Sequence, residues 1–191
     1  WEKSRRIGAS WVCAGEAVLE ASRVNGSDTY YASYNREATQ QFIEDCAHWT
    51  KALYGIQRAI KKEQEEKESD VLTYTIRFPS GHAIKSLSAK PNNLRNRKGR
   101  IILDEAAHTP DLKASLKAAL AILMWCGRLD VISSHSGVDS YFNRIVEDIR
   151  AGRRRYGLHR TTLDDAIAQG LYKTICASTK KQWAQEEQEQ W

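Results

Sequence analysis

The pattern of hydrophobic and polar positions divides the first half of the chain into helices and strands. Apolar residues recur at three- and four-residue spacing, which is typical of a helix with one buried face, in residues 10–21 and 36–60. Residues 29–35 and 71–89 are instead rich in β-branched and aromatic residues, which favours strands, and with the turn "PSG" the second segment is expected to be a hairpin or two neighbouring strands. The pattern predicts a helix, a strand, a second helix and this strand pair, in that order.

Two features of this half lead to more specific expectations. The first helix is expected to bury its larger apolar side chains, which are Val12, Cys13, Val18 and Leu19. The charged run "KKEQEEKES" at residues 61–69 is expected to be the solvated end of the second helix, because charge runs of this kind usually face water.

The second half of the chain alternates between strands and helices. A polar loop at residues 90–99 leads into "RIILDEA", whose apolar run from Arg100 is too short for a buried helix and fits an interior strand of a parallel sheet. Helices in 111–127 and 140–152 each close on a glycine, and a strand with a polar turn in 128–137 lies between them. This alternation predicts an α/β fold with a mainly parallel central sheet flanked by helices, whose active site lies at the carboxyl ends of the strands.

Residues 153–191 depart from this alternation. They contain a basic, strand-like link, a helix over 163–178 that is capped by Thr162, and a polar end. The cluster Arg153–Arg155 has two interpretations, contact with DNA phosphates or a solvated link.

Composition excludes several classes of protein. The chain has 191 residues, 41% hydrophobic and 28% charged, and no apolar run approaches the roughly 20 residues of a membrane helix, so we expect a soluble protein. The four cysteines are far apart and form no C-x-x-C pair, which argues against a zinc site and a disulfide framework. A net charge of +5 is compatible with an anionic partner such as nucleic acid but does not demonstrate one.

Candidate chemistry lies in three segments at places that suit an α/β nucleotide hydrolase, and two of them carry charged groups. The loop "KSRRIGAS" opens the first helix, where free backbone N–H groups and the helix dipole favour phosphate, although Ala9 stands where a standard phosphate loop has its lysine. Two adjacent carboxylates follow the strand "RIIL": Asp104 would hold Mg²⁺ directly or through water, and Glu105 would orient or deprotonate the attacking water.

A third segment, "DVISSHSG", ends a strand in small hydroxyl residues that could sense a terminal phosphate. Each signal also has a purely structural interpretation, because basic turns, helix-capping acidic pairs and serines after strands are common. The aromatic residues are interpreted as core or interface rather than as platforms for stacked bases. They are Trp49, Trp125, Tyr30, Tyr31 and Tyr34.

At these segments the chain resembles the large terminase subunits of tailed phages, particularly Mu-like and lambda-like ones. "IILDEAA" resembles a Walker B motif followed by the catalytic glutamate, and "SSHSG" resembles motif III, the coupling motif. The opening loop resembles a deviant Walker A in which the lysine stands at the front. Lys3 matches that forward lysine, Arg5 and Arg6 the basic pair, and Gly8, Ala9 and Ser10 the turn into the helix.

The resemblance implies a P-loop ATPase fold of the ASCE type and a role for each matching residue. ATP would bind against Lys3, Ser4, Arg5, Arg6, Ile7, Gly8, Ala9 and Ser10. Asp104 and Ser10 would hold Mg²⁺, Glu105 would be catalytic, and Ser133, Ser134 and His135 would couple hydrolysis to movement. Arg95 would act as an arginine finger on a neighbouring subunit, with Arg97 as the second choice.

The same resemblance implies an organisation and a set of partners. Residues 1–152 would be the ATPase core, with its first strand truncated, and residues 153–191 a lid or linker towards a nuclease domain that the chain lacks. Partners would be double-stranded DNA, the portal protein, the small terminase subunit and further copies in a ring, with no membrane, in the host cytoplasm. Two alternatives stay open: a helicase-like DNA-stimulated ATPase, and a non-hydrolysing scaffold from a decayed prophage gene.

Overall fold

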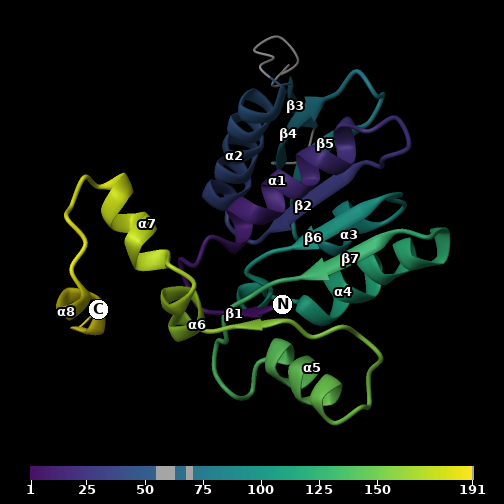
Figure 1. The fold of residues 1–191 in the computed structure, drawn as a ribbon. Coiled ribbons are helices and arrows are strands. Elements are labelled where there is room, and N and C mark those ends of the chain that lie inside the picture. Colours follow the sequence, from purple (N-terminus) through teal and green to yellow (C-terminus); the bar gives the residue numbers. More distant parts are fainter. Residues whose placement is uncertain (55–62, 68–70, 191) are drawn as a thin grey trace.

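A mainly parallel sheet forms the centre of the computed structural model, which describes residues 1–54, 63–67 and 71–190 (Figure 1). The strand order is β3-β4-β5-β2-β6-β7, in which β5, β2, β6 and β7 run parallel to one another. The strand β4 runs antiparallel to both of its neighbours, β5, with which it forms the hairpin, and β3. The bounds are β2 Thr29–Ser33, β3 Glu63–Lys67, β4 Val71–Arg77, β5 Ala83–Ser88, β6 Arg100–Leu103 and β7 Arg128–Val131. The predicted α/β class and the hairpin are confirmed.

A second, two-stranded sheet continues beside β7. The strand β1 (Glu2–Lys3) pairs in parallel with β8 (Arg160–Thr161), and Glu2 also forms a parallel bridge with Ser133, just after β7. The spatial order is therefore β6, β7, β1, β8. This order brings the loop that follows β1 to the edge where β6 and β7 end, and it joins the C-terminal part to the core.

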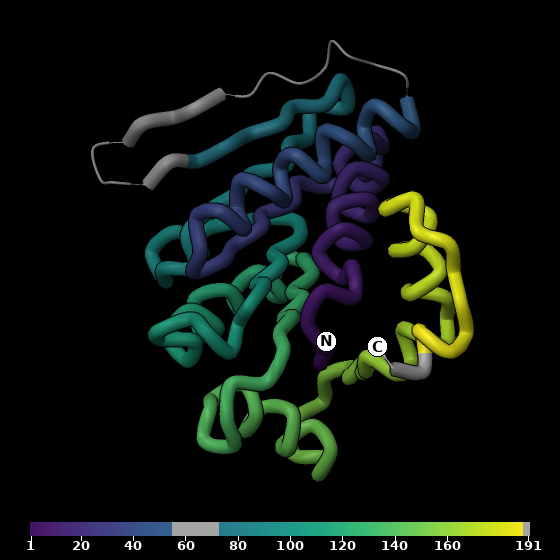
Figure 2. The backbone as a smooth tube through the Cα atoms, turned by 90° about the vertical axis from the view of Figure 1, so that its left-hand side faces the viewer, coloured from purple at the N-terminus to yellow at the C-terminus, as the bar shows by residue number. Residues whose placement is uncertain are grey.

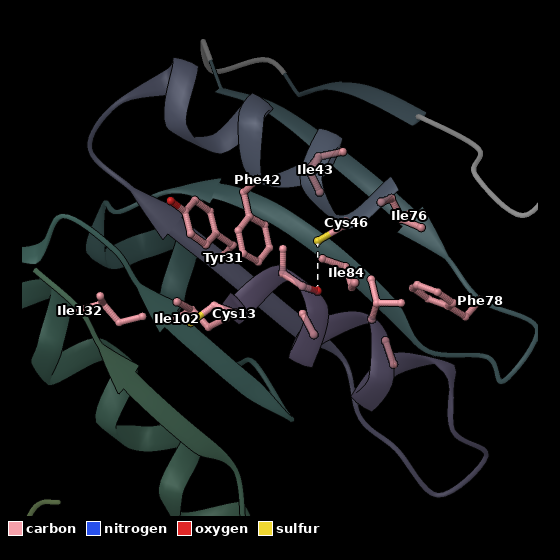
Figure 3. Close-up of a cluster of buried hydrophobic side chains, with 14 of the residues drawn as sticks. Cys13, Tyr31, Phe42, Ile43, Cys46, Ile76, Phe78, Ile84, Ile102 and Ile132 are labelled. Carbon is pink, nitrogen blue, oxygen red and sulfur yellow. Dashed lines mark hydrogen bonds between the residues drawn. The ribbon is translucent and has the colours of Figure 1, made fainter. Parts of the chain in front are cut away.

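Helices cover both faces of the large sheet. Helices α1 (Ala9–Ser22) and α2 (Arg36–Tyr54) pack on one face, over a core that includes Tyr31, Phe42 and Ile102 (Figure 3). The short α3 (Pro91–Leu94), α4 (Leu112–Leu120) and α5 (Tyr141–Arg150) cover the other face, and the 3₁₀ turns η1 (Ala106–His108) and η2 (Ala121–Trp125) adjoin them. Successive strand residues alternate between the two cores, as the pleat requires.

The buried face of α1 differs from the prediction. Cys13 and Val18 are buried as expected, but Val12 is 49% exposed and Leu19 41%. The helix instead turns its small residues inward, and this lets α2 approach closely. At Gly15 an added Cβ would lie 3.0 Å from the indole of Trp49. Because α1 is apolar on most sides, periodicity alone could not distinguish its two faces.

Several predicted elements need correction. The prediction that the charged run ends the second helix is wrong, because residues 63–67 form the edge strand β3. Edge strands commonly carry charge. Residues 55–62 and 68–70 lie outside the described residues. The loop 90–99 contains the helix α3. The helix expected over 163–178 is two helices, α6 (Leu163–Ala168) and α7 (Leu171–Ser178), because Gly170 takes a positive φ of 96° between them. Its predicted cap is confirmed, since Thr162 and Asp165 form a capping box.

The C-terminal helices extend away from the sheet. Figures 1 and 2 show α6, α7 and α8 (Gln185–Gln190) as an arm that leaves the core after β8. Among the described residues, no helix is both long and apolar enough to cross a membrane. Of the aromatic residues expected in the core or at an interface, Trp125 is 71% exposed and Tyr34 49%, so neither belongs to the core.

Candidate active site

The carboxyl ends of β1 and β6 bring together a lysine and two carboxylates. Lys3 lies on β1 with only 8% of its surface exposed, and its Nζ is 3.1 Å from Oε1 of Glu105, which follows β6. Asp104, the neighbour of Glu105, is 2% exposed. A buried ammonium against Glu105 offsets part of the repulsion between the two adjacent carboxylates.

Three hydrogen-bond donors hold the carboxylate of Asp104. Its Oδ2 accepts from the hydroxyl of Ser10 at 2.5 Å and from the hydroxyl of Tyr31 at 2.8 Å, and its Oδ1 accepts from the backbone N–H of Glu105 at 2.8 Å. A serine hydroxyl against a carboxylate is a set of hard oxygen ligands that fits Mg²⁺, which often takes one or two protein ligands together with substrate phosphates. Within the described residues, no larger cluster of His, Cys, Asp and Glu is placed to hold a metal.

The loop between β1 and α1 suits a phosphate. Its backbone turns through positive φ at Arg6 (58°) and at Gly8 (83°), and α1 then begins after Gly8 with no side chain of the described residues capping its first N–H groups. Uncapped N–H groups at a helix start are donors for an anion. Ser4 and Ile7 are half-buried, Ala9 is buried, and the side chains of Arg5 and Arg6 are exposed.

Glu105 has an unusual backbone conformation. Its φ of 51° lies in the left-handed region, which non-glycine residues seldom adopt, and it starts the turn η1. Its side chain is 29% exposed, and His108 Nε2 lies 4.0 Å from Oε2. Residues held in such conformations are found preferentially at functional sites. The turn directs the carboxylate of Glu105 to Lys3, while Asp104 points to Ser10.

Ser133 links the two halves of this site. Its carbonyl accepts from the backbone N–H of Lys3 at 3.0 Å, and its buried hydroxyl accepts from the N–H of Ala107 in η1 at 3.0 Å. Ser134 is also buried, and within the described part of the chain its hydroxyl has no hydrogen-bond partner. Ser133 therefore connects β1 directly to the turn that carries Glu105.

His135 belongs to a different cluster, centred on Glu2. Its Nε2 is 2.9 Å from Oε1 of Glu2, and Arg150 at the end of α5 donates to Oε2 at 2.6 Å. Arg160 of β8 lies 3.9 Å from the same carboxylate. Burial raises the pKa of Glu2, but the hydrogen bond from His135 and the charge of Arg150 outweigh burial, so the pKa lies below its ordinary value. Sequence reasoning missed Glu2, because nothing in the sequence around it marks its partners.

The two candidate finger arginines lie on the opposite face of the sheet from α1. Arg95 is exposed at the end of α3, which packs against α4. Arg97 is half-buried, donates to the carbonyl of Asn93 at 2.9 Å and lies over the ring of Tyr30 at 5.0 Å. The structure thus brings Lys3, Ser10, Asp104 and Glu105 together and leaves Arg95 at the surface.

The sequence matches one known protein family over nearly its whole length. The family is described as "Terminase large subunit, T4likevirus-type, N-terminal", and its model covers residues 1–188. The chain belongs to the terminase large-subunit family. This membership decides against the helicase-like alternative.

Relatives of this terminase chain are phage and prophage proteins. It is 44% identical over 197 residues to the Mu-like prophage FluMu protein gp28 of Haemophilus influenzae, and 42% identical over 198 residues to the probable terminase large subunit gp28 of Escherichia phage Mu. Both matches include the whole chain, which spans 38% and 36% of these two proteins.

Solved structures share the fold of this terminase chain. The large terminase of a thermophilic bacteriophage, in complex with ADP, superposes with a TM-score of 0.57 at 16% identity, over 87% of this chain and 40% of that one. The large terminase ATPase domain of Thermus phage P74-26 superposes with a TM-score of 0.50 at 20% identity, over 72% of this chain and 59% of that one. At such identities the likeness shows the ATPase-domain fold.

Proposed function

We propose that this terminase chain is the ATPase domain of a phage DNA-packaging motor, which hydrolyses Mg·ATP to drive double-stranded DNA into the prohead. The observation that carries the proposal is the meeting of Lys3, Ser10, Asp104 and Glu105 at the carboxyl ends of β1 and β6. A phosphate-binding helix start, a metal-binding oxygen pair and a candidate base are the parts that phosphoryl transfer needs. The terminase of the thermophilic bacteriophage, which has the same fold, was solved with ADP.

Each group in the site has one task in this proposal. The N–H groups at the start of α1 and the ammonium of Lys3 bind phosphate oxygens, while Ser10 and Asp104 hold Mg²⁺. The metal, when bound, neutralises charge on the phosphates and aligns them for displacement. Glu105 orients the attacking water and accepts its proton. Ser4, Arg5, Arg6, Ile7, Gly8 and Ala9 form the rest of the nucleotide-binding loop.

In this proposal the contacts of β1 couple ATP hydrolysis to movement. Because side chains alternate along a strand, Lys3 faces the site and Glu2 faces His135, Arg150 and Arg160. A shift of the loop on hydrolysis would reach α5 and β8 through Glu2, and would reach η1 through Ser133. Ser133, Ser134 and His135 are thus proposed as coupling residues, and residues 153–191 as the part that moves.

The remaining assignments follow from the packaging role. Arg95 is proposed to act in trans on a neighbouring subunit of a ring, which its exposed position permits, and such a finger is worth about 10³- to 10⁵-fold in rate. The portal protein and the small terminase subunit are the proposed partners, in the cytoplasm of the bacterial host. Arg153 and Arg154 both pair with Asp148, which favours a structural link over free DNA-binding groups.

The substitution Glu105→Gln tests the catalytic assignment. It removes the base while keeping the size of the side chain, so phosphate release should fall about 10²- to 10⁴-fold, while the affinity for AMP-PNP, measured by calorimetry, should change little. The exposed Glu44→Gln on α2 is the matched control and should retain full turnover. Full turnover by Glu105→Gln would refute the catalytic role. No AMP-PNP binding by the unmodified chain would favour the non-hydrolysing scaffold.

A further inference from the structure

We propose that Tyr31 is a positioning residue for the metal site: its hydroxyl holds Asp104 in the orientation in which Asp104 and Ser10 can share Mg²⁺. This inference rests on the proposed function, because it concerns the same site. It assigns a role to a side chain that the sequence analysis expected only in the core or at an interface.

The hydroxyl of Tyr31 reaches the carboxylate from the centre of the sheet. Tyr31 lies on β2, between β5 and β6, and is 1% exposed. Its Oη donates to Oδ2 of Asp104 at 2.8 Å, and the hydroxyl of Ser10 donates to the same oxygen. With the N–H of Glu105 on the other oxygen, both ends of the carboxylate are held, which fixes its rotation.

The ring of Tyr31 is itself held in place. It stacks on Phe42 of α2 with the ring centroids 3.9 Å apart and the planes 10° from parallel, as the close-up of this core shows (Figure 3). Phe42 is likewise 1% exposed. A hydroxyl on a ring packed in this way has little freedom, so it defines a fixed point for the carboxylate that it contacts.

The direction of the hydrogen bond is also fixed. A carboxylate oxygen can only accept, so the hydroxyl of Tyr31 is the donor in its hydrogen bond to Oδ2 of Asp104. Outer partners of metal ligands set ligand orientation in this manner, and their loss typically lowers metal affinity or activity 10- to 100-fold.

The neighbouring residue provides a matched control. Tyr30 is also buried on β2, but it belongs to the core on the opposite face of the sheet and donates to Asp28 Oδ2 at 3.1 Å, away from the site. Tyr31→Phe and Tyr30→Phe each remove one buried tyrosine hydroxyl that is bonded to a carboxylate. A purely structural role would give the two variants the same phenotype.

The experiment measures the affinity of the chain and of both variants for AMP-PNP, by calorimetry, once with Mg²⁺ and once with EDTA. The quantity compared is the gain in affinity that Mg²⁺ provides, and melting temperatures report on folding. We expect Tyr31→Phe to reduce this gain about tenfold while its affinity in EDTA and its melting temperature match those of Tyr30→Phe. Tyr30→Phe should keep the gain of the unmodified chain.

The outcomes separate this inference from the proposed function. An equal Mg²⁺-dependent gain in Tyr31→Phe and Tyr30→Phe would overturn the positioning role and leave the ATPase proposal intact. A loss of affinity in EDTA as large as the loss with Mg²⁺ would also overturn it, because the effect would then not concern the metal. An unmodified chain that binds no AMP-PNP would overturn both.

Discussion

Lys3 and Glu105 form an ion pair with 3.1 Å between Nζ and Oε1, although 102 residues separate them in the sequence. The strand β7 lies between their two strands, so the pair bridges the sheet edge at the place where the phosphate loop begins. In the proposed function Lys3 has two partners, the carboxylate of Glu105 and an incoming phosphate. Its position would let a lysine at the front of the loop serve the proposed phosphate site, in which Ala9 stands in place of the usual lysine.

Replacing this lysine should weaken nucleotide binding. Lys3→Met keeps much of the buried stem and removes the ammonium. Because a hydrogen bond to a charged group is worth about 1.5–3 kcal/mol, we expect the dissociation constant of AMP-PNP to rise about 10- to 100-fold by calorimetry. Lys51→Met on the exposed side of α2 is the control and should leave binding unchanged. A change of less than about twofold in Lys3→Met would remove Lys3 from the site.

The cluster around Glu2 should make stability depend on acid pH. The pKa of Glu2 in the folded chain lies below its ordinary value of 4.5. Its contribution to the unfolding free energy is therefore complete above that ordinary value and is lost as the pH falls through the lowered folded-state pKa. Urea unfolding should give a difference in unfolding free energy between the unmodified chain and Glu2→Gln. This difference should be constant above about pH 5 and should shrink in more acidic buffer.

Glu44→Gln serves as the control for this measurement, because the side chain of Glu44 is exposed on α2. The difference in unfolding free energy between Glu44→Gln and the unmodified chain should not change across the same pH range. If the difference in unfolding free energy between Glu2→Gln and the unmodified chain does not shrink at acid pH, His135 and Arg150 do not stabilise the ionised carboxylate of Glu2.

Sequence patterns predicted those elements and site residues that are determined by residues adjacent in the sequence. The apolar run of β6 and the acidic pair after it are local, and parallel interior strands have a recognisable composition. The roles of Tyr31 and Glu2 depend on partners 73 and 133 residues away, Asp104 and His135, and no local pattern encodes them. The strand β3 was missed for the same reason, since pairing with β4 stabilises a charged segment that by itself suits a helix end.

Replacing the glycine at the start of α1 should lower stability because of its left-handed backbone conformation, and not because a side chain lacks space there. Gly8 has a φ of 83°, and among the described residues nothing lies within 4 Å of an added Cβ. A left-handed conformation costs an ordinary residue about 1–2 kcal/mol, so Gly8→Ala should lower the unfolding free energy by about that amount. Gly8→Asn should lose less, because asparagine tolerates this region. A larger loss for asparagine than for alanine, measured by urea unfolding, would point to a steric cause instead.

Arg100 and Arg128 share two carboxylates but should differ sharply in their contribution to stability. The guanidinium of Arg100, at the start of β6, is 4% exposed and contacts Asp130 at 2.6 Å and Glu16 of α1 at 2.7 Å. Arg128 is 61% exposed and contacts the same two residues at 3.0 and 3.8 Å. Arg100 therefore ties the helix of the phosphate loop to the strand of Asp104, whereas Arg128 lies at the solvent edge.

Arg100→Met should lower the unfolding free energy by about 1.5–3 kcal/mol, because it removes charge-assisted hydrogen bonds from a buried guanidinium to two carboxylates, which are partly exposed and keep Arg128 as a partner. Arg128→Met should cost less than about 1 kcal/mol, as is usual for an exposed ion pair. Urea unfolding of both variants checks this, with circular dichroism to confirm that each is folded at the outset. Similar losses in the two variants would mean that burial does not strengthen the pairs of Arg100. A large loss confined to Arg100→Met would instead identify this arginine as the main electrostatic link between α1 and the strand that carries the acidic pair.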